Sequence, residues 1–298
     1  MRGIMNHATI RRALLWVWLL LMPALALAQT QLGSAAAMQA KHASVKSQLE
    51  QNVFGRPLVL ESSEASGQLS GNIFAVVAYP FDKVSGSLGK PSGWCEVLML
   101  HLNTKHCAVR EADSAKTVAV AVGRKFDQPL SEAQKVDFVW QPATVSADYF
   151  SARLSADKGP LSTRDYRIEL EATPLDGGKT FIHLSYSYGY GTAARIAMQG
   201  YLATIGSDKV GFTATGTNAS GQPEYVGGVR GVVERNTMRY YLAIDAYLGA
   251  PDAKQLPGRL ATWFDSTERY ARQLHEVERN DYLTMKRNEY KRMEGGGS

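Results

Sequence analysis

The stretch NIFAVVAYPFDKVSGSLGKPSGWCEVL, residues 72–98, decides the fold class of this chain. Its first seven residues are an apolar, β-branched run, which predicts a strand that stops at Tyr79 and Pro80. The residues that follow predict two short helices, over 81–88 and 93–102. A strand that leads directly into a helix pair must find its sheet partners elsewhere in the chain.

Those partners are predicted both before and after this stretch. The segments with the pattern of strands are 58–61, 117–126, 135–141, 149–154, 164–172, 180–188, 209–215 and 225–230. Two of them alternate clearly: 164–172 places Tyr166 with its aliphatic residues on one face, and 180–188 places Tyr186 and Tyr188 opposite His183. The intervening Asp-Gly-Gly is typical of a tight hairpin, so this part of the sheet is antiparallel.

The remaining segments predict helices. Residues 34–51 form a surface helix with a narrow apolar stripe, 192–205 form another helix, and 232–248 form a longer one that must cover the sheet. Residues 259–293 form a charged helical tail that is solvated or frayed after about residue 275.

The order of these elements resembles the helix-grip fold of the START-like (polyketide cyclase or Bet v 1-like) superfamily over residues 58–250. The residues that carry the resemblance are 72–98 and YYLAIDAYL, residues 240–248. It implies an α+β fold in which a curved antiparallel sheet wraps a long C-terminal helix, with helical extensions at both ends. In such a fold the long helix lines a cavity. The superfamily has no invariant site motif, so the resemblance assigns no functional residue.

The first residues have the pattern of a secretory signal peptide. Three arginines precede a nearly apolar run of 16 residues, and Ala26-Leu27-Ala28 is a small-x-small cleavage site. The alternative is an uncleaved membrane anchor, but the run is shorter than the roughly 20 residues of a spanning helix. We therefore expect cleavage after Ala28, and a periplasmic or secreted protein without a transmembrane span in its mature form.

The predicted organisation follows from these boundaries. The segments are a signal peptide (1–28), an N-terminal helical segment (29–57), a helix-grip domain (58–250), a charged helical tail (251–294) and linker or tag residues (295–298).

Charge argues against a nucleic-acid partner. The full chain has 33 basic and 28 acidic residues, and the signal peptide contains three of the basic ones and none of the acidic ones. The mature chain would therefore have a net charge of +2, without the clustered basic excess of a nucleic-acid-binding protein. With 45% hydrophobic and 20% charged residues, the composition is that of a globular protein.

The segment WCEVLMLHLNTKHC, residues 94–107, holds the two cysteines of the chain. In an oxidising compartment Cys95 and Cys107 are most simply a disulfide. Glu96, His101 and His106 are also metal-ligand types, but their spacing matches no metal motif. We therefore expect surface histidines, no metal and no cofactor.

Tyrosine is abundant, with 14 residues against nine phenylalanines. An apolar ring with a polar tip suits a cavity for an amphipathic ligand, and it also suits an ordinary interface between a sheet and a helix. The expected ligand-binding residues lie in the two alternating strands and along the long helix: Tyr166, His183, Tyr186, Tyr188, Arg230, Arg239, Tyr241 and Asp245. Arg230 can pair with Glu234, whereas Arg235 and Arg239 repel each other unless a carboxylate lies nearby. Asp245 either meets a partner such as an arginine or a ligand, or lies at the edge of its face and reaches water.

The sequence contains no strong catalytic motif. We therefore expect an exported binding protein for a hydrophobic or amphipathic small molecule such as a lipid. One alternative is a hydrolase or cyclase on the same scaffold, with His183 as the base and Arg230 or Arg239 as the anion stabiliser. Another is a non-catalytic cell-envelope assembly protein whose tail, 259–293, docks an envelope partner.

Overall fold

The computed structural model describes residues 32–112, 115–203 and 209–294, so the expected signal peptide and linker lie outside the described residues. The helices are α1 (Ala35–Glu50), α2 (Phe81–Leu88), α3 (Pro91–Leu100), α4 (Thr192–Ala203), α5 (Gly228–Gly249), α6 (Leu256–Glu268), α7 (Ala271–Leu274) and α8 (Arg279–Glu294), with 3-10 turns η1 (Leu130–Glu132), η2 (Pro160–Ser162) and η3 (Ala253–Gln255). The strands are β1 (Leu58–Ala65), β2 (Gln68–Val77), β3 (Thr104–Ala112), β4 (Ala115–Val122), β5 (Gln134–Val145), β6 (Phe150–Lys158), β7 (Thr163–Leu175), β8 (Lys179–Tyr190), β9 (Ala214–Thr217) and β10 (Pro223–Tyr225).

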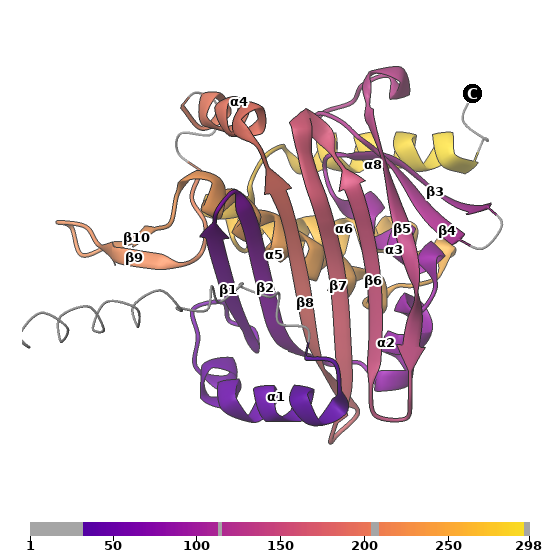
Figure 1. The fold of residues 1–298 in the computed structure, drawn as a ribbon, viewed down its shortest axis with the longest axis vertical. Coiled ribbons are helices and arrows are strands. Elements are labelled where there is room, and N and C mark those ends of the chain that lie inside the picture. The colour runs from indigo at the N-terminus through magenta and orange to yellow at the C-terminus, as the bar shows by residue number, and fades with distance from the viewer. Residues whose placement is uncertain (1–31, 113–114, 204–208, 295–298) are drawn as a thin grey trace, which may run out of the picture. The chain divides into compact units, whose positions relative to one another are not determined.

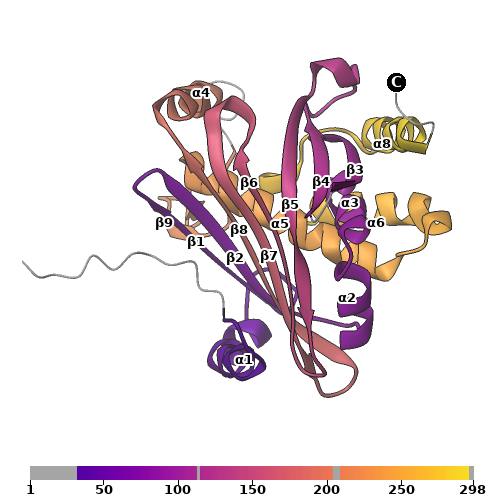
Figure 2. The ribbon, with the colours of Figure 1, turned by 45° about the vertical axis from the view of Figure 1, so that its right-hand side comes forward.

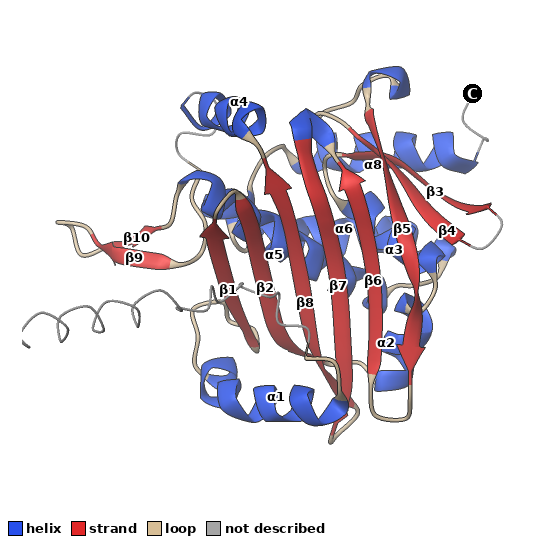
Figure 3. Cartoon of the chain, viewed as in Figure 1, coloured by secondary structure: helices blue, strands red, loops and turns tan. Residues whose placement is uncertain are grey.

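Eight of these strands form one antiparallel sheet in the order β1-β2-β8-β7-β6-β5-β4-β3 (Figures 1 and 3). The predicted hairpin joins β7 to β8, where Gly177 and Gly178 adopt φ values of 72° and 68° that other residues rarely adopt. The long antiparallel pairing brings β2, near the start of the chain, against β8.

The sheet is covered on both faces (Figure 2). On one face α1 contacts β1, β2, β7 and β8, and it buries Met38, Val45 and Leu49, the narrow stripe that the sequence predicted. On the other face α5 crosses β1, β2 and β8, α3 packs against β3 and β4, and α6 packs on the outside of α5. We call these the α1 face and the α5 face.

The predicted α+β class and the helix-grip arrangement are confirmed, because the strand, helix pair, antiparallel strands and long helix follow in the expected order. Two details differ. Strand β3 was not predicted, because it is an edge strand whose charged residues blur the alternation. The strands expected over 209–215 and 225–230 are replaced by the short separate hairpin β9–β10, in a segment interrupted by Gly211, Gly216 and Pro223.

The tail after residue 275 is not solvated or frayed, contrary to the prediction. Helix α8 packs against β3 and α6, and Tyr282, Lys286 and Glu289 have no exposed surface. The charge-dense sequence misled because two of its charged side chains pair with each other inside the protein, at 2.8 Å. Since α6 and α8 use their apolar anchors within the chain, a tail that docks an envelope partner loses its main support.

The predicted disulfide is confirmed between Cys95 in α3 and Cys107 in β3, with the Cα atoms 5.4 Å apart. Both residues are buried, and the bond ties the second helix of the pair to the edge strand. A loop of this length stabilises a fold by about 3 kcal/mol in the chain-entropy model. Within the described residues, no helix is both long enough and apolar enough to cross a bilayer.

Candidate ligand-binding site

Four tyrosines from three elements meet between the sheet and α5. The ring of Tyr186 lies 5.6 Å from that of Tyr188 on the same strand, β8, and 5.1 Å from that of Tyr240 on α5. Tyr166 on β7 stacks on Tyr188 with ring centroids 5.2 Å apart. We call these four residues the tyrosine cluster.

Strand alternation explains why three of these rings share the α5 face. Along the β7–β8 pair the cross-strand neighbours on this face are first Leu170 and Leu184, and then Ile168 and Tyr186. The inner surface therefore changes along the strands from aliphatic side chains to tyrosines. The tyrosine cluster occupies the end of the sheet where β8 runs into α4, at the top of Figure 1.

Burial raises the pKa of every ring in the tyrosine cluster, and that of Tyr186 well above its usual value. The hydroxyls therefore remain neutral and act as hydrogen-bonding groups. The hydroxyl of Tyr166 lies 2.8 Å from that of Thr163, and the side chain of Asn236 on α5 interacts with the hydroxyl of Tyr186. The site thus presents polar tips on an aromatic surface.

His101, at the end of α3, extends the tyrosine cluster on one side. Its ring lies 5.3 Å from the ring of Tyr240, and only 6% of the residue is exposed, so the expected surface histidine is instead an interior one. The backbone N–H of Asn103 donates to Nδ1 at 3.2 Å, which assigns the ring proton to Nε2. Burial, followed by the charges of Arg239, Lys286 and Lys125, lowers the pKa of His101 well below its usual value, so the ring is neutral.

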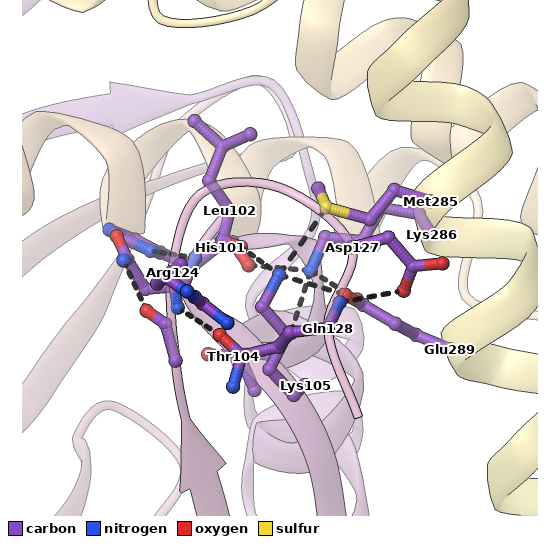
Figure 4. Close-up of polar contacts among 12 residues, drawn as sticks. His101, Leu102, Thr104, Lys105, Arg124, Asp127, Gln128, Met285, Lys286 and Glu289 are labelled. Carbon is purple, nitrogen blue, oxygen red and sulfur yellow. Dashed lines mark hydrogen bonds and ion pairs between the residues drawn. The ribbon is translucent and has the colours of Figure 1, made fainter. Parts of the chain in front are cut away.

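A buried charged cluster lies directly behind His101 (Figure 4). Lys286 donates to the backbone carbonyls of His101 and Thr104, at 2.6 and 2.8 Å. The carboxylate of Glu289 bridges Lys286 and Lys105, at 2.8 and 2.9 Å. Burial lowers the pKa of Lys286 to about 8, although Glu289 partly offsets this effect. These contacts hold the turn that contains His101 against α8.

One end of the tyrosine cluster reaches solvent. Tyr166 and Tyr240 are only partly buried, whereas Tyr186 and Tyr188 are buried. Helix α4 contacts β8, α5 and η2 at this end of the sheet. These bordering elements carry two exposed apolar side chains, Leu161 on η2 and Ile196 on α4, with 62% and 63% of each residue exposed.

His183 does not belong with these rings, contrary to the expected ligand-binding set. It lies on the α1 face, where it is buried and stacked on Phe74 at 4.4 Å. Its ring nitrogens lie 2.9 Å from Glu171 and 3.0 Å from Asn72. The reason is the two-residue period of the strand, which sends His183 to the face opposite Tyr186. The sheet therefore separates the supposed base from Arg230 and Arg239, which removes the geometry that the hydrolase or cyclase alternative requires.

The two α5 arginines of the expected set are engaged by other protein groups, although the charge of Arg239 acts on Tyr240 of the tyrosine cluster. Arg230 is 3.9 Å from Glu234, as the spacing allowed, and donates to the hydroxyl of Ser62. Arg239 forms a 2.8 Å ion pair with Glu276, the nearby carboxylate that its spacing from Arg235 required. Both arginines are thus held by protein groups.

Tyr241 and Asp245 lie on the side of α5 that faces Arg56. Asp245 forms a 2.7 Å ion pair with Arg56, and both side chains keep some exposure, at 23% and 17%. Asp245 therefore has an arginine partner, which is the first of the two predicted alternatives. It also keeps some exposure to water, as the second alternative predicted. The side chain of Tyr241 interacts with Arg56 and not with the tyrosine cluster.

The structure thus brings together Tyr166, Tyr186 and Tyr188 from the expected set, and adds Tyr240 and His101. Tyr240 was missed because the sequence spacing predicts one buried face, which contains Tyr241, whereas α5 is buried almost all round, between the sheet and α6. The signal that could have found it is the doubled Tyr240-Tyr241, which must point one ring to each side of the helix.

The other candidate metal ligands serve structural roles. Glu96 pairs with Arg259 at 2.7 Å, and both cysteines are in the disulfide. In the part of the chain that the structure describes, no three histidine, cysteine or acidic side chains come close enough to hold a metal ion.

No protein-family model and no curated protein match this sequence. Among solved structures, the chain is similar to a truncated norcoclaurine synthase from Thalictrum flavum, with 13% identity over 49% of this chain and 94% of that one, at a TM-score of 0.32. It is also similar to human StAR-related lipid transfer protein 5, with 13% identity over 57% of this chain and 89% of that one, at a TM-score of 0.30. A conserved protein from Geobacillus kaustophilus gives 12% identity over 61% and 95%, at 0.35.

These similarities concern the fold alone, and at such TM-scores they carry no argument about the site. The order of elements is what identifies the fold: a helix pair after β2, an antiparallel sheet and the long α5 across it. The chain thus has a helix-grip arrangement, in which a curved antiparallel sheet packs against the long helix α5.

Proposed function

We propose that this protein binds a small amphipathic molecule between the sheet and α5, at the tyrosine cluster. The observation that carries the proposal is the change from aliphatic to tyrosine side chains along the α5 face of β7 and β8. Ligand sites are typically aromatic surfaces with a few polar groups that fix orientation, and the tyrosine cluster has this composition.

An ordinary core would place leucine or phenylalanine at these positions. Burying a hydroxyl costs free energy unless it forms a hydrogen bond, and a core that serves stability alone avoids that cost. Here the aliphatic part of the same face already supplies such a core, with Leu170 and Leu184 fully buried. The hydroxyls of Tyr166 and Tyr186 have protein partners, so what favours a ligand with both apolar and polar parts is the combination of aromatic surface and polar tips.

The rings contact one another in this structure, so a ligand must displace at least one of them. Tyr166 and Tyr240 are the rings that can move, because both are partly exposed. The exposed Leu161 and Ile196 lie on η2 and α4, the elements that border this end, and would give an apolar molecule its first contacts.

A competing location is a surface groove of about 410 Å³ along β1. It is lined mainly by apolar side chains of the loop after α1 and of the β9–β10 hairpin, including Phe54, Phe212 and Tyr225. An apolar molecule could bind there without entering the interior, so the experiment must distinguish the two places.

Calorimetric titration with decanoic acid and 1-decanol at neutral pH makes this distinction. We expect one molecule bound per chain, and we expect Tyr240→Ala to weaken binding by about twofold to tenfold, the value of one aromatic contact. The matched variant Tyr225→Ala should bind as the wild type does. The proposal fails if the wild-type protein binds neither compound, or if Tyr225→Ala alone weakens binding.

Export to an oxidising compartment is a second part of the proposal. It is supported by the signal-peptide pattern of residues 1–28 and by the disulfide, since such bonds are rare in the reducing cytosol. N-terminal sequencing of the protein made in a bacterial host should find Gln29 as the first residue of the periplasmic form. Recovery of the intact chain from the cytosol only would contradict it.

A further inference from the structure

The Nε2–H group of His101 is a buried donor that lacks an acceptor. Asn103 uses Nδ1, and among the described residues none accepts a hydrogen bond from Nε2. The side chain of Asn236 comes close enough to favour the protonated ring, but it does not complete that bond. Leaving a buried donor unsatisfied costs about 1–3 kcal/mol, so its persistence in the interior needs an explanation.

The donor faces the tyrosine cluster. Because Nδ1 bonds back to its own turn, Nε2 lies on the side of the ring toward α5, where Asn236 and Tyr240 are located. The hydroxyl of Tyr186 also interacts with Asn236. A ligand atom placed among these rings would therefore meet a neutral N–H donor whose tautomer is already fixed.

The surroundings of His101 favour an anionic ligand atom. Behind it, Lys105 and Lys286 share the single carboxylate of Glu289. Arg239 and Lys125 each form a 2.8 Å ion pair with Glu276. The charged side chains that act most strongly on the ring of His101 are Arg239, Lys286 and Lys125, and all three are cations.

The charge that acts on the buried ring of His101 is therefore positive. In a low-dielectric interior such a charge attracts a negative group more strongly than it would in water.

We propose that His101 anchors the carboxylate of a long-chain carboxylic acid, which accepts a hydrogen bond from Nε2–H while its alkyl chain lies along the tyrosine cluster. This inference rests on the proposed function and names the ligand class of the same site. The hydrogen bond completes the open donor of His101, and the carboxylate offsets part of the positive charge that acts on its ring. A neutral alcohol can do only the first of these.

The test compares decanoic acid with 1-decanol in calorimetric titrations at pH 7.5, on the wild type and on His101→Phe. Phenylalanine keeps the ring and removes the donor, and the backbone carbonyl that holds Lys286 remains. We expect the wild type to bind decanoate at least about tenfold more tightly than decanol, because a charged hydrogen bond is worth about 1.5–3 kcal/mol. In His101→Phe this preference should shrink by about threefold or more, because decanoate loses a charged hydrogen bond, whereas decanol loses a neutral one worth about twofold to tenfold in affinity. The matched control is His106→Phe, which should retain the preference.

The outcomes separate the two proposals. Equal affinity of the wild type for both compounds, or a preference of the same size in His101→Phe, overturns the role of His101 and leaves the binding function intact. Binding of neither compound overturns the function itself.

If His101→Phe does not fold, protein labelled with ¹⁵N-histidine supplies the second measurement. Decanoate should move the Nε2–H resonance of His101 downfield, and an unchanged resonance at saturation contradicts the proposal.

Discussion

Glu171 has no exposed surface, and its carboxylate accepts four hydrogen bonds on the α1 face. The donors are the backbone N–H groups of Leu32 and Gly33, the hydroxyl of Tyr149 and the ring of His183, at 2.7–3.0 Å. Burial alone would raise the pKa of Glu171, but these hydrogen bonds outweigh it and lower the pKa. The residue thus fastens the chain before α1 to the sheet, and His183 serves this structural purpose.

Replacing this carboxylate should be costly. We expect Glu171→Gln to lower the free energy of unfolding by about 3 kcal/mol at pH 7, because it leaves buried donors poorly satisfied. Urea denaturation measures this loss. The matched control is Glu61→Gln, which removes an exposed ion pair with Lys41 and should cost less than about 1 kcal/mol.

The same residue predicts an acid-sensitive fold. Because the pKa of Glu171 is lower in the folded state, its stabilising contribution is present above the usual value of 4.5 and is lost as the pH falls through the folded-state pKa. The difference between wild type and Glu171→Gln should therefore shrink in denaturation experiments below pH 4.5. A difference that stays constant down to pH 3 would show that the ionised form contributes nothing.

For Lys286 we expect the opposite pH dependence, in which the stability of the fold rises at alkaline pH. Its pKa is about 8 in the folded state against a usual 10.5, so its buried charge opposes folding below pH 8, and this cost is relieved as the pH rises toward 10.5. Between pH 8 and 10, we expect the stability of the wild type to rise by about 2 kcal/mol relative to Lys286→Met. Parallel stability curves for the two proteins would contradict the buried ammonium.

At this scale the sequence predicts a side chain's face better than its partners. Period-two alternation correctly placed Tyr166, Tyr186 and Tyr188 together, and the same alternation put His183 opposite them, although it was grouped with them. Leu100 and Leu102 flank His101, but its place between the end of α3 and a polar turn does not show from the sequence that the histidine itself is buried. Its burial arises from α5 and α8, more than 120 residues away.

Among the elements, α8 shows how a charged sequence can be part of a core. Tyr282 stacks on Trp263 of α6 at 5.0 Å and donates to the carbonyl of Leu100. Beside it, Lys286 and Lys105 are neutralised only in part, by Glu289. The helix is therefore fastened through both apolar packing and a buried ionic cluster.

Glu289 should be the most sensitive position of α8. We expect Glu289→Gln to lower the free energy of unfolding by about 3–5 kcal/mol, because two buried ammonium groups then lack any carboxylate. The neighbouring Asn288 is exposed, and Asn288→Ala should change stability by less than about 0.5 kcal/mol. Thermal denaturation of the pair compares the two, and equal melting temperatures would exclude a supporting role for the cluster.

The sequence pattern clearly predicted helix or strand where one face of the element is buried and the other contacts water. Helix α1 and the strands β7 and β8 meet this condition on at least part of their length, and their patterns were clear. The helix type was also predicted for α5 and α8, but the set of buried side chains was not, because α5 is enclosed and the buried positions of α8 are partly ionic. In both cases the partner surface, and not the local sequence, decides what is buried.

At the scale of the molecule, the sheet separates two kinds of chemistry. The α1 face contains a fully satisfied structural network around Glu171. The α5 face contains the tyrosine cluster and the open donor of His101. Of these two networks, only the one on the α5 face leaves a polar group without a hydrogen-bond partner among the described residues. This difference between the two faces is the reason that we expect the ligand on the α5 face.

Photo-crosslinking with a diazirine-bearing decanoic acid tests that account most directly. After irradiation and trypsin digestion, mass spectrometry should find the label on residues 180–195 of β8 and α4 and on 240–254 of α5, and excess decanoate should suppress it. Labelling confined to the surface groove, at Phe54 or Tyr225, would contradict an interior site. So would the absence of any label that decanoate can suppress.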